Sequence, residues 1–330
     1  MANPNFATME ANTINSLTLP LISQKISDNI TGKIPFFYLM NKVGRKESDN
    51  GGLEYRFPVF KELATAQAYT GLTALTNLER DLVSSAVLYR KQFSLDITLS
   101  GTKLLQNSGD DPTAVVNYIA AQIEMAEEGM KNTLAGSSLG IFSSQGDSDL
   151  GITGLKAMLP ETYTAGTYAG LDRATYSYWR SKYNSVATGF NTDGLISMRT
   201  LQLDCVRGDE APSVIIMTAA GYANLWRSLV GTVSFDTTQP IPQFGDLAFP
   251  HINWAGSIVI IDDGMTANQA FFLNLKYLKL LVHRDRDMAI RDFITPVGED
   301  SITGRMYWAG NLVCNNLARQ GILCGTIETW

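Results

Sequence analysis

The segment from residue 110 to residue 136, DDPTAVVNYIAAQIEMAEEGMKNTLAG, constrains the fold more than any other stretch of the chain. Its apolar side chains recur at steps of three and four, which is the period of one face of an α-helix. Asp111 can cap the start and Pro112 suits the first turn. A helix of about 24 residues spans roughly 36 Å, which is long enough for the spine of a domain. The apolar face consists of Val115, Ile119, Ile123, Ala126, Met130 and Leu134.

Two strands with a period of two flank a long polar segment nearer the N-terminus. Strand 55–60 places Tyr55, Phe57 and Val59 on one face, and strand 94–100 alternates in the same way. The segment between them is rich in Ala and Thr, and a connection of this length in a folded protein is usually functional or becomes ordered by a partner. We therefore predict a projecting hairpin made of these two strands.

The C-terminal half has the pattern of a mixed α/β unit. Residues 212–230 predict a buried strand followed by a helix that Thr218 caps, and residues 256–264 predict a second strand. The closing segments 271–284 and 305–323 are rich in strand formers. The longest apolar runs are strand-sized and far shorter than the roughly 20 residues that a membrane helix needs. We predict no membrane span.

Composition narrows the class of protein. A formal net charge of −6 argues against a protein whose main task is to grip nucleic acid. Cys205, Cys314 and Cys324 have no CxxC spacing, so we expect buried free thiols. The N-terminus has neither the basic start nor the apolar stretch of an export signal, which predicts that the protein stays in the compartment where it is made, a cytoplasm.

No pattern of residues in the sequence supports an enzyme. The two histidines, His251 and His283, have no other metal ligand near them in sequence, and we expect His283 to end a strand at a charged surface. Nucleotide-binding patterns are absent. Residues 146–151, GDSDLG, begin like a calcium loop but lack its later ligands, and Asp262 and Asp263 read more simply as a turn than as a catalytic edge. We predict no catalytic residue, cofactor or metal.

The stretch TAGTYAGLDRATYSYWR, residues 164–180, allows two interpretations. Gly166 and Gly170 suit either a backbone cradle for a phosphate or a tight turn. The charged and aromatic residues that follow them suit a packed contact of the kind enriched at interfaces. We favour a structural junction near subunit contacts, which involves Gly166, Gly170, Asp172, Arg173, Trp179 and Arg180.

The order of several segments resembles the major capsid protein of tailed bacteriophages with the HK97-like fold. GGLEYRFPVF (51–60) is similar to the start of that family's extended loop. SGTKLLQNSGDDPTAVVNYI (100–119) is similar to the lead into its spine helix, and residues 154–180 to the segment that leads into its axial domain. The segments that resemble its C-terminal strands are 249–264, 270–284 and 306–323.

This resemblance implies an α+β fold with four parts: an N-terminal arm, an extended β-hairpin loop, a peripheral domain with a long spine helix, and an α/β axial domain. It also explains the long hairpin, because in such shells the loop lies across a neighbouring subunit. The expected divisions are an arm at 1–50, an extended loop at 51–100, a peripheral domain at 101–145, an axial domain at 146–285, and C-terminal strands at 286–330 that return to both domains.

The implied function is structural. Subunits would form pentamers and hexamers of an icosahedral virion capsid, assembled in the host bacterial cytoplasm, around double-stranded DNA that is held without sequence-specific binding. The partners would be other copies of the chain, a portal, in some members a cement or decoration protein, and a separate scaffolding protein, because only about 50 residues precede the loop. The expected assembly interface is Tyr55, Phe57, Tyr69, Arg90, Gly166, Gly170, Asp172, Arg173, Trp179 and Arg180.

Other interpretations stay open. An encapsulin-like nanocompartment shell shares the fold but encloses enzyme cargo. A virion decoration protein or adhesin fits the long helix poorly, and an α/β enzyme would need a pocket with perturbed carboxylates. Some capsid proteins crosslink neighbours through Lys and Asn, but the resemblance does not fix such positions here, and we predict no crosslink. Replacing Trp179 and Arg180 with Ala should impair assembly more than subunit folding.

Overall fold

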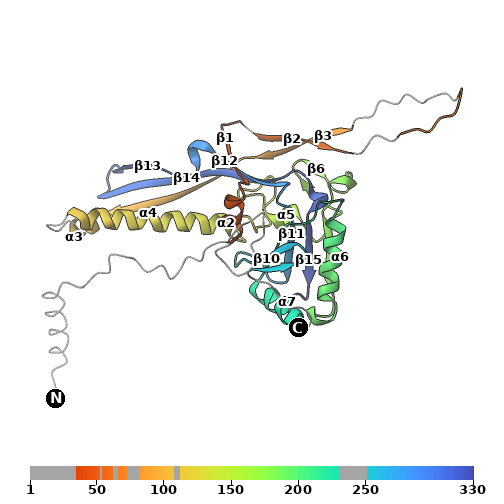
Figure 1. The fold of residues 1–330 in the computed structure, drawn as a ribbon. Coiled ribbons are helices and arrows are strands. Elements are labelled where there is room, and N and C mark those ends of the chain that lie inside the picture. Colours follow the sequence, from red (N-terminus) through yellow and green to blue (C-terminus); the bar gives the residue numbers. More distant parts are fainter. Residues whose placement is uncertain (1–34, 53, 62–65, 73–81, 108–111, 231–250) are drawn as a thin grey trace, which may run out of the picture. The chain divides into compact units, whose positions relative to one another are not determined.

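The computed structural model describes residues 35–52, 54–61, 66–72, 82–107, 112–230 and 251–330. Helices and strands occur in a mixed order, and the fold is α+β as predicted (Figure 1). The predicted cap at Asp111 and the N-terminal arm before residue 35 lie outside the described residues. Among the described helices, none is both long enough and apolar enough to cross a membrane.

A five-stranded sheet is built around the 14-residue strand β14 (Ser301–Cys314). The strands β12 (Leu278–His283) and β13 (Ala289–Ile294) pair antiparallel with successive parts of β14. The long strand β4 (Lys91–Ser100) pairs antiparallel with residues 301–310 of β14. A short strand, β1 (Lys46–Asp49), runs parallel to β12 and completes the sheet.

The long helix α4 (Pro112–Ala135) packs against this sheet, and its bounds agree with the prediction. At Gly129 the helix lies next to Leu95 of β4: a Cβ atom added to this glycine would be in van der Waals contact with Cδ1 of Leu95, at 3.7 Å. The predicted apolar face points into the main core where its side chains are described: Ala126, Met130 and Leu134 are buried there, and the half-buried Ile123 packs against it. Two shorter helices, α2 (Pro35–Lys42) and α3 (Gly101–Asn107), precede it.

A six-stranded sheet forms the other half of the fold, in the order β7-β15-β11-β8-β10-β9. Successive residues of its strands face two different cores, so Ile216 and Phe271 join the main core while Ile215 and Phe272 join a second one. Helices α6 (Leu195–Cys205) and α7 (Ala219–Val230) contribute Leu201 and Leu225 to the second core. Both faces are therefore covered, which explains the continuous apolar runs in these strands.

The remaining elements are short. The strands of the six-stranded sheet are β7 (Lys182–Val186), β8 (Val214–Met217), β9 (Ile252–Trp254), β10 (Ser257–Ile261), β11 (Gln269–Leu273) and β15 (Gly321–Gly325). The others are α5 (Leu155–Met158), β5 (Thr167–Tyr168), β6 (Leu171–Asp172) and the helical turns η1 (Ser177–Trp179), η2 (Phe190–Gly194), η3 (Arg284–Arg286) and η4 (Leu317–Arg319).

The hairpin exists, but the predicted pairing of its strands is wrong. Strand β2 (Glu54–Phe60) pairs with β3 (Val83–Tyr89), in register from Glu54 opposite Tyr89 to Phe60 opposite Val83. Strand β4, which includes the predicted partner 94–100, pairs with β14 instead. The reason is that the apolar face of β4 is buried in the main body, where Ile97 and Leu99 are 4% and 2% exposed.

The pairing of strand β12 does not follow the expected division of the chain into segments. The proposed axial segment, 146–285, includes β12, yet β12 pairs with β1 and β14 in the five-stranded sheet. The C-terminal strand β15 pairs instead with β7 and β11 of the six-stranded sheet. Residues 286–330 thus contribute strands to both sheets. The exact domain boundaries stay a prediction.

Candidate assembly site at the base of the hairpin

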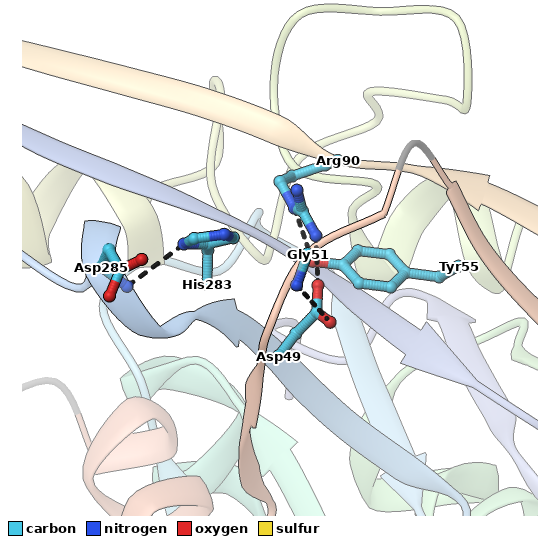
Figure 2. Close-up of polar contacts among 6 residues, drawn as sticks. All are labelled: Asp49, Gly51, Tyr55, Arg90, His283 and Asp285. Carbon is cyan, nitrogen blue, oxygen red and sulfur yellow. Dashed lines mark hydrogen bonds and ion pairs between the residues drawn. The ribbon is translucent and has the colours of Figure 1, made fainter.

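Three polar side chains meet where the hairpin joins the five-stranded sheet (Figure 2). Arg90 occupies the corner between β3 and β4, and its Nε atom donates to Oη of Tyr55 at 3.2 Å. Its Nη2 atom donates to Oδ2 of Asp49, the last residue of β1. The second carboxylate oxygen of Asp49 accepts a hydrogen bond from the backbone N–H of Gly51 at 3.1 Å. One guanidinium group therefore links β1, β2 and the exit from β3.

The charges of this cluster are matched. Desolvation alone would raise the pKa of Asp49, but hydrogen bonds from Gly51 and Arg90 outweigh it and hold that pKa below its ordinary value. Desolvation raises the pKa of Tyr55, so its hydroxyl stays neutral. The guanidinium carbon of Arg90 also lies 5.4 Å from the centroid of the Tyr55 ring, within the range of a cation–π contact.

The neighbouring end of β12 is a charged surface, as predicted for His283. His283 is the register partner of Asp49 and the last residue of β12. Its Nδ1 atom accepts a hydrogen bond from the backbone N–H of Asp285 at 3.1 Å, and Figure 2 shows this contact beside the Arg90 cluster. Lys46 at the start of β1 and Asp287, four residues after His283, form an ion pair at 2.5 Å. His283 thus ends the strand in a charged turn.

The glycine pair in residues 164–180 forms a tight turn. Gly166 and Gly170 have φ values of 86° and 76°. Strand β5 lies between the two glycines, strand β6 follows Gly170, and the two strands pair antiparallel. The backbone N–H of Gly170 donates to Oδ2 of Asp147 at 3.3 Å. A carboxylate of the chain itself therefore occupies the position that a phosphate would need at this N–H, which supports the turn and disfavours the cradle.

Trp179 lies inside the subunit, 1% exposed, and connects this turn to the hairpin. Its ring stacks on Tyr168 with centroids 5.9 Å apart, and its Nε1 atom donates to the carbonyl oxygen of Tyr168 at 2.9 Å. Phe57 of the hairpin packs 6.4 Å from the same indole. The backbone N–H of Val87 in β3 also donates to the carbonyl oxygen of Ala169 at 2.9 Å. The base of the hairpin thus rests on this segment.

The two arginines of the segment hold backbone carbonyl groups. Arg173 is 1% exposed, and its Nη2 atom donates to the carbonyl oxygens of Ala157 and Met158 at 3.0 and 2.7 Å. Arg180, half-buried, donates to the carbonyl oxygen of Arg173 at 2.7 Å. Asp172 accepts hydrogen bonds from Ala174 and Thr175, which lower its pKa. Because Arg173 and Trp179 point inward, any effect of these two on subunit contacts would be indirect.

Three members of the expected interface are exposed: Tyr69 of the hairpin, and Gly166 and Gly170 of the turn. Tyr69 is 66% exposed, and Phe60 and Leu72 are also strongly exposed. Tyr55 and Phe57 are half-buried at the base, and so is Arg90. The expected residues therefore divide by burial. Tyr55, Phe57, Arg90, Asp172 and Arg180 are half-buried, Arg173 and Trp179 are buried, and Tyr69, Gly166 and Gly170 are exposed.

Two buried charged residues were missed from the sequence. Lys91, 5% exposed, directs its Nζ atom at the carbonyl oxygens of Gly146, Asp147 and Asp149. This ammonium group holds the turn 146–151, where the N–H of Gly146 also donates to Oδ2 of Asp149 at 2.6 Å. The turn interpretation of GDSDLG is confirmed. No cluster of three or more metal-binding side chains is present in the described part of the chain.

Asp262 is the second buried charged residue that was missed from the sequence. It is 2% exposed, and its two carboxylate oxygens accept hydrogen bonds from the backbone N–H groups of Phe36 and Gly264 at 3.1 and 3.0 Å. The bond from Gly264 confirms the predicted turn. The bond from Phe36 fixes the first turn of α2, whose N–H groups have no partner within the helix. The sequence pattern gave no signal for this contact between residues 226 positions apart.

Solved structures similar to this chain include capsids. No protein-family model matches the sequence, and no curated protein matches it either. The capsid asymmetric unit of cyanophage A-1(L) is similar over 95% of this chain and 98% of its own, with a TM-score of 0.66 and 17% identity. The capsid of a native GTA particle has a TM-score of 0.59 and 13% identity, over 98% of this chain and 99% of its own.

An encapsulin complex is also similar. The SrpI encapsulin complex from Synechococcus elongatus PCC 7942 matches over 98% of this chain and 96% of its own, with a TM-score of 0.55 and 10% identity. At these identities the likeness concerns the fold, and it extends over nearly the whole length of each protein. The chain therefore has the HK97-like capsid fold.

Proposed function

We propose that this chain is the major capsid protein of a tailed bacteriophage, which self-assembles into pentamers and hexamers of an icosahedral shell around double-stranded DNA. The observation that carries the proposal is the full-length similarity to capsid subunits, at a TM-score of 0.66 for the cyanophage capsid. Several other similar structures also come from phages, among them Mycobacterium phage Bobi and Gordonia phage Cozz. Capsids and an encapsulin are among these neighbours, which favours a structural protein over an enzyme.

The hairpin supports a role in assembly. An isolated two-stranded hairpin is marginally stable in water at best, and β2 and β3 pair only with each other within the described residues. Phe60, Tyr69 and Val83 leave apolar surface in solvent. A neighbouring subunit that covers this surface would supply the missing burial. We propose that the exposed side chains contact a second copy, while the Arg90 cluster and Trp179 set the position of the hairpin.

Weak contacts suffice for such a shell. A standard interface buries about 1,600 Å² in total, and each subunit of a closed lattice makes several contacts at once. Moderate contacts also allow a misplaced subunit to leave. The function is thus the free energy and geometry of contacts rather than covalent chemistry.

The decisive experiment is electron microscopy with size-exclusion light scattering. The protein is expressed alone and then together with the products of neighbouring genes. We expect closed shells or rings of five and six subunits in at least one preparation. A stable monomer or dimer in both preparations would contradict the proposal.

An encapsulin-like nanocompartment is the second candidate, and the similarity to the SrpI complex is the observation that favours it. The two functions differ in what the shell encloses. Purified particles that contain DNA of uniform length support the phage capsid. Particles that contain a co-purified enzyme and no DNA would support the compartment.

The remaining partners are also proposals. We propose a separate scaffolding protein, a portal, and room for a cement or decoration protein, with assembly in the bacterial cytoplasm. Enclosed DNA would be held without sequence-specific binding, which fits a net charge of −6. Mass spectrometry of purified particles tests the list, and a mature N-terminus far inside the chain would replace the separate scaffold by an internal one.

A further inference from the structure

A groove of about 780 Å³ lies between β13 and β14 and has an excess of positive charge. Arg291 of β13 stands directly opposite Arg305 of β14 in the antiparallel register. Like charges in directly opposed positions destabilise a strand pair. Arg286 and Arg291 also lie over the Tyr307 ring, with guanidinium carbons 5.5 and 5.6 Å from its centroid. Three arginines thus gather on one part of the sheet in a chain whose net charge is negative.

Carboxylates of the same subunit neutralise these arginines incompletely. Arg305 pairs with Asp96 of β4 at 2.7 Å, and both side chains are more than half exposed. Arg286 donates to the side-chain oxygen of Gln92 at 2.7 Å. Arg291 is exposed and forms no salt bridge with any described side chain. The groove therefore offers a cationic position to an acidic group from outside the subunit.

The loop that joins β13 to β14 has the complementary character. Val297 is fully exposed and Ile294 is 67% exposed. Glu299 is exposed and forms no salt bridge within the described residues, and its Oε2 atom accepts a hydrogen bond from Oγ of Ser301 at 3.4 Å. Gly298, at a φ of 87°, turns the chain between Val297 and Glu299. The loop thus presents the apolar side chain of Val297 and the carboxylate of Glu299 beside a groove lined by Ile294 and Arg291. The second carboxylate of the loop, that of Asp300, lies against Gly101 at the start of α3.

We infer that the β13–β14 groove of one subunit binds residues 297–299 of a second copy of this chain, with Glu299 paired to Arg291 and Val297 packed on Ile294. The inference rests on the proposed function, because it names the residues of one contact within the shell. Each copy carries both halves of the contact. Copies can therefore form a ring in which every groove is filled by the next loop.

Charge reversal tests the pairing. The variants R291E and E299K each place like charges together in the contact, whereas the double variant R291E/E299K restores an opposite pair in every contact. We expect each single variant to raise the protein concentration needed for shell formation about tenfold or more, equivalent to about 1.4 kcal/mol per subunit. The double variant should return that concentration to within about threefold of the wild-type value.

Folding is measured separately from assembly. Thermal unfolding and light scattering at low concentration show whether each variant is a folded subunit. If R291E fails to fold, E299K still tests the contact, because it changes only an exposed loop. The control is R207E, in an exposed turn at residues 207–210 of the other half of the fold. We expect R207E to assemble like the wild type.

The outcomes separate the two proposals. Single variants that assemble like the wild type, or a double variant no better than the worse single one, would overturn this contact and leave the capsid function intact. Wild-type protein that forms no shell under any condition tested would overturn the proposed function and, with it, the contact.

Discussion

The Nε atom of Arg90 donates to the Oη atom of Tyr55 at 3.2 Å, and this contact joins the first strand of the hairpin to the corner where the chain leaves it. The variant Y55F removes the acceptor and keeps the ring. We expect it to lower the free energy required to open the hairpin by about 1 kcal/mol, which is the usual net contribution of one hydrogen bond. The variant R90A should cost more, about 1–3 kcal/mol, because it also leaves the carboxylate of Asp49 without its ion pair.

Amide hydrogen exchange in β2 and β3 measures this opening directly. The matched control is R56A, since Arg56 lies in the same hairpin and pairs with Glu54, but its side chain is 65% exposed. An exposed pair of this kind is worth about 0–1 kcal/mol, so protection should barely change. Equal loss of protection in R56A and R90A would contradict a special role for the Arg90 corner.

Because Trp179 is buried, we expect its replacement to destabilise the subunit itself. The indole fills space between Tyr168 and Phe57 and is 1% exposed. We therefore expect W179A to lower the free energy of unfolding of the isolated subunit by about 3–5 kcal/mol. The expectation from the sequence alone, that the Trp179 and Arg180 double variant would impair assembly more than subunit folding, must be tested with the two changes apart.

Urea unfolding of W179A, W179F and R180A separates the contributions. W179F keeps most of the ring but loses the hydrogen bond to the carbonyl oxygen of Tyr168, so about 1 kcal/mol should be lost beyond the change in packing. R180A removes bonds from a half-buried side chain and should also cost about 1 kcal/mol. A W179A subunit as stable as the wild type, yet unable to assemble, would restore the direct-contact role.

Local periodicity accounts for what the sequence predicted correctly. The apolar steps in α4 and the strand–cap–helix pattern around Thr218 depend on neighbours in the chain, and Oγ1 of Thr218 does accept the N–H of Gly221 at 3.3 Å. The burial of all three cysteines follows from residue type in the same way. Such patterns are readable because one face of a single element is enough to define them.

Contacts distant in sequence account for what was missed. The true partner of β2, VSSAVLY, shows a weak apolar alternation, with Ala86 and Leu88 as its fully buried members. The stronger pattern in β4 reports burial against the main body and not pairing with β2. The buried roles of Lys91 and Asp262 depend on carbonyl and N–H groups brought from other segments, which no spacing in the sequence records.

The three thiols should be unreactive in the folded subunit. Burial raises the pKa of Cys205, Cys314 and Cys324 to about 12 in each case, so almost no thiolate exists near pH 8. We expect a thiol reagent to modify none of them in native protein and all three after unfolding in denaturant. Rapid modification of one thiol in native protein would show that its surroundings open on the timescale of the assay.

The acidity of Asp262 should make subunit stability depend on pH between about 4 and 7. Burial raises its pKa from 3.8 to about 6, in spite of the hydrogen bonds from Gly264 and Phe36, which favour the charged form. Because the folded pKa lies above the unfolded value, protonation favours the folded state. Its contribution is complete below about pH 4 and is lost as the pH rises through 6.

A shift of this size corresponds to about 3 kcal/mol, at about 1.4 kcal/mol for each pKa unit. The variant D262N cannot titrate at this position, whatever its own stability. We therefore expect the free energy of unfolding of the wild type to rise, relative to that of D262N, as the pH falls from 7 to 4. Parallel pH profiles for the two proteins would mean that the Asp262 carboxyl keeps an ordinary pKa, because its hydrogen bonds from Phe36 and Gly264 offset the cost of burying its charge.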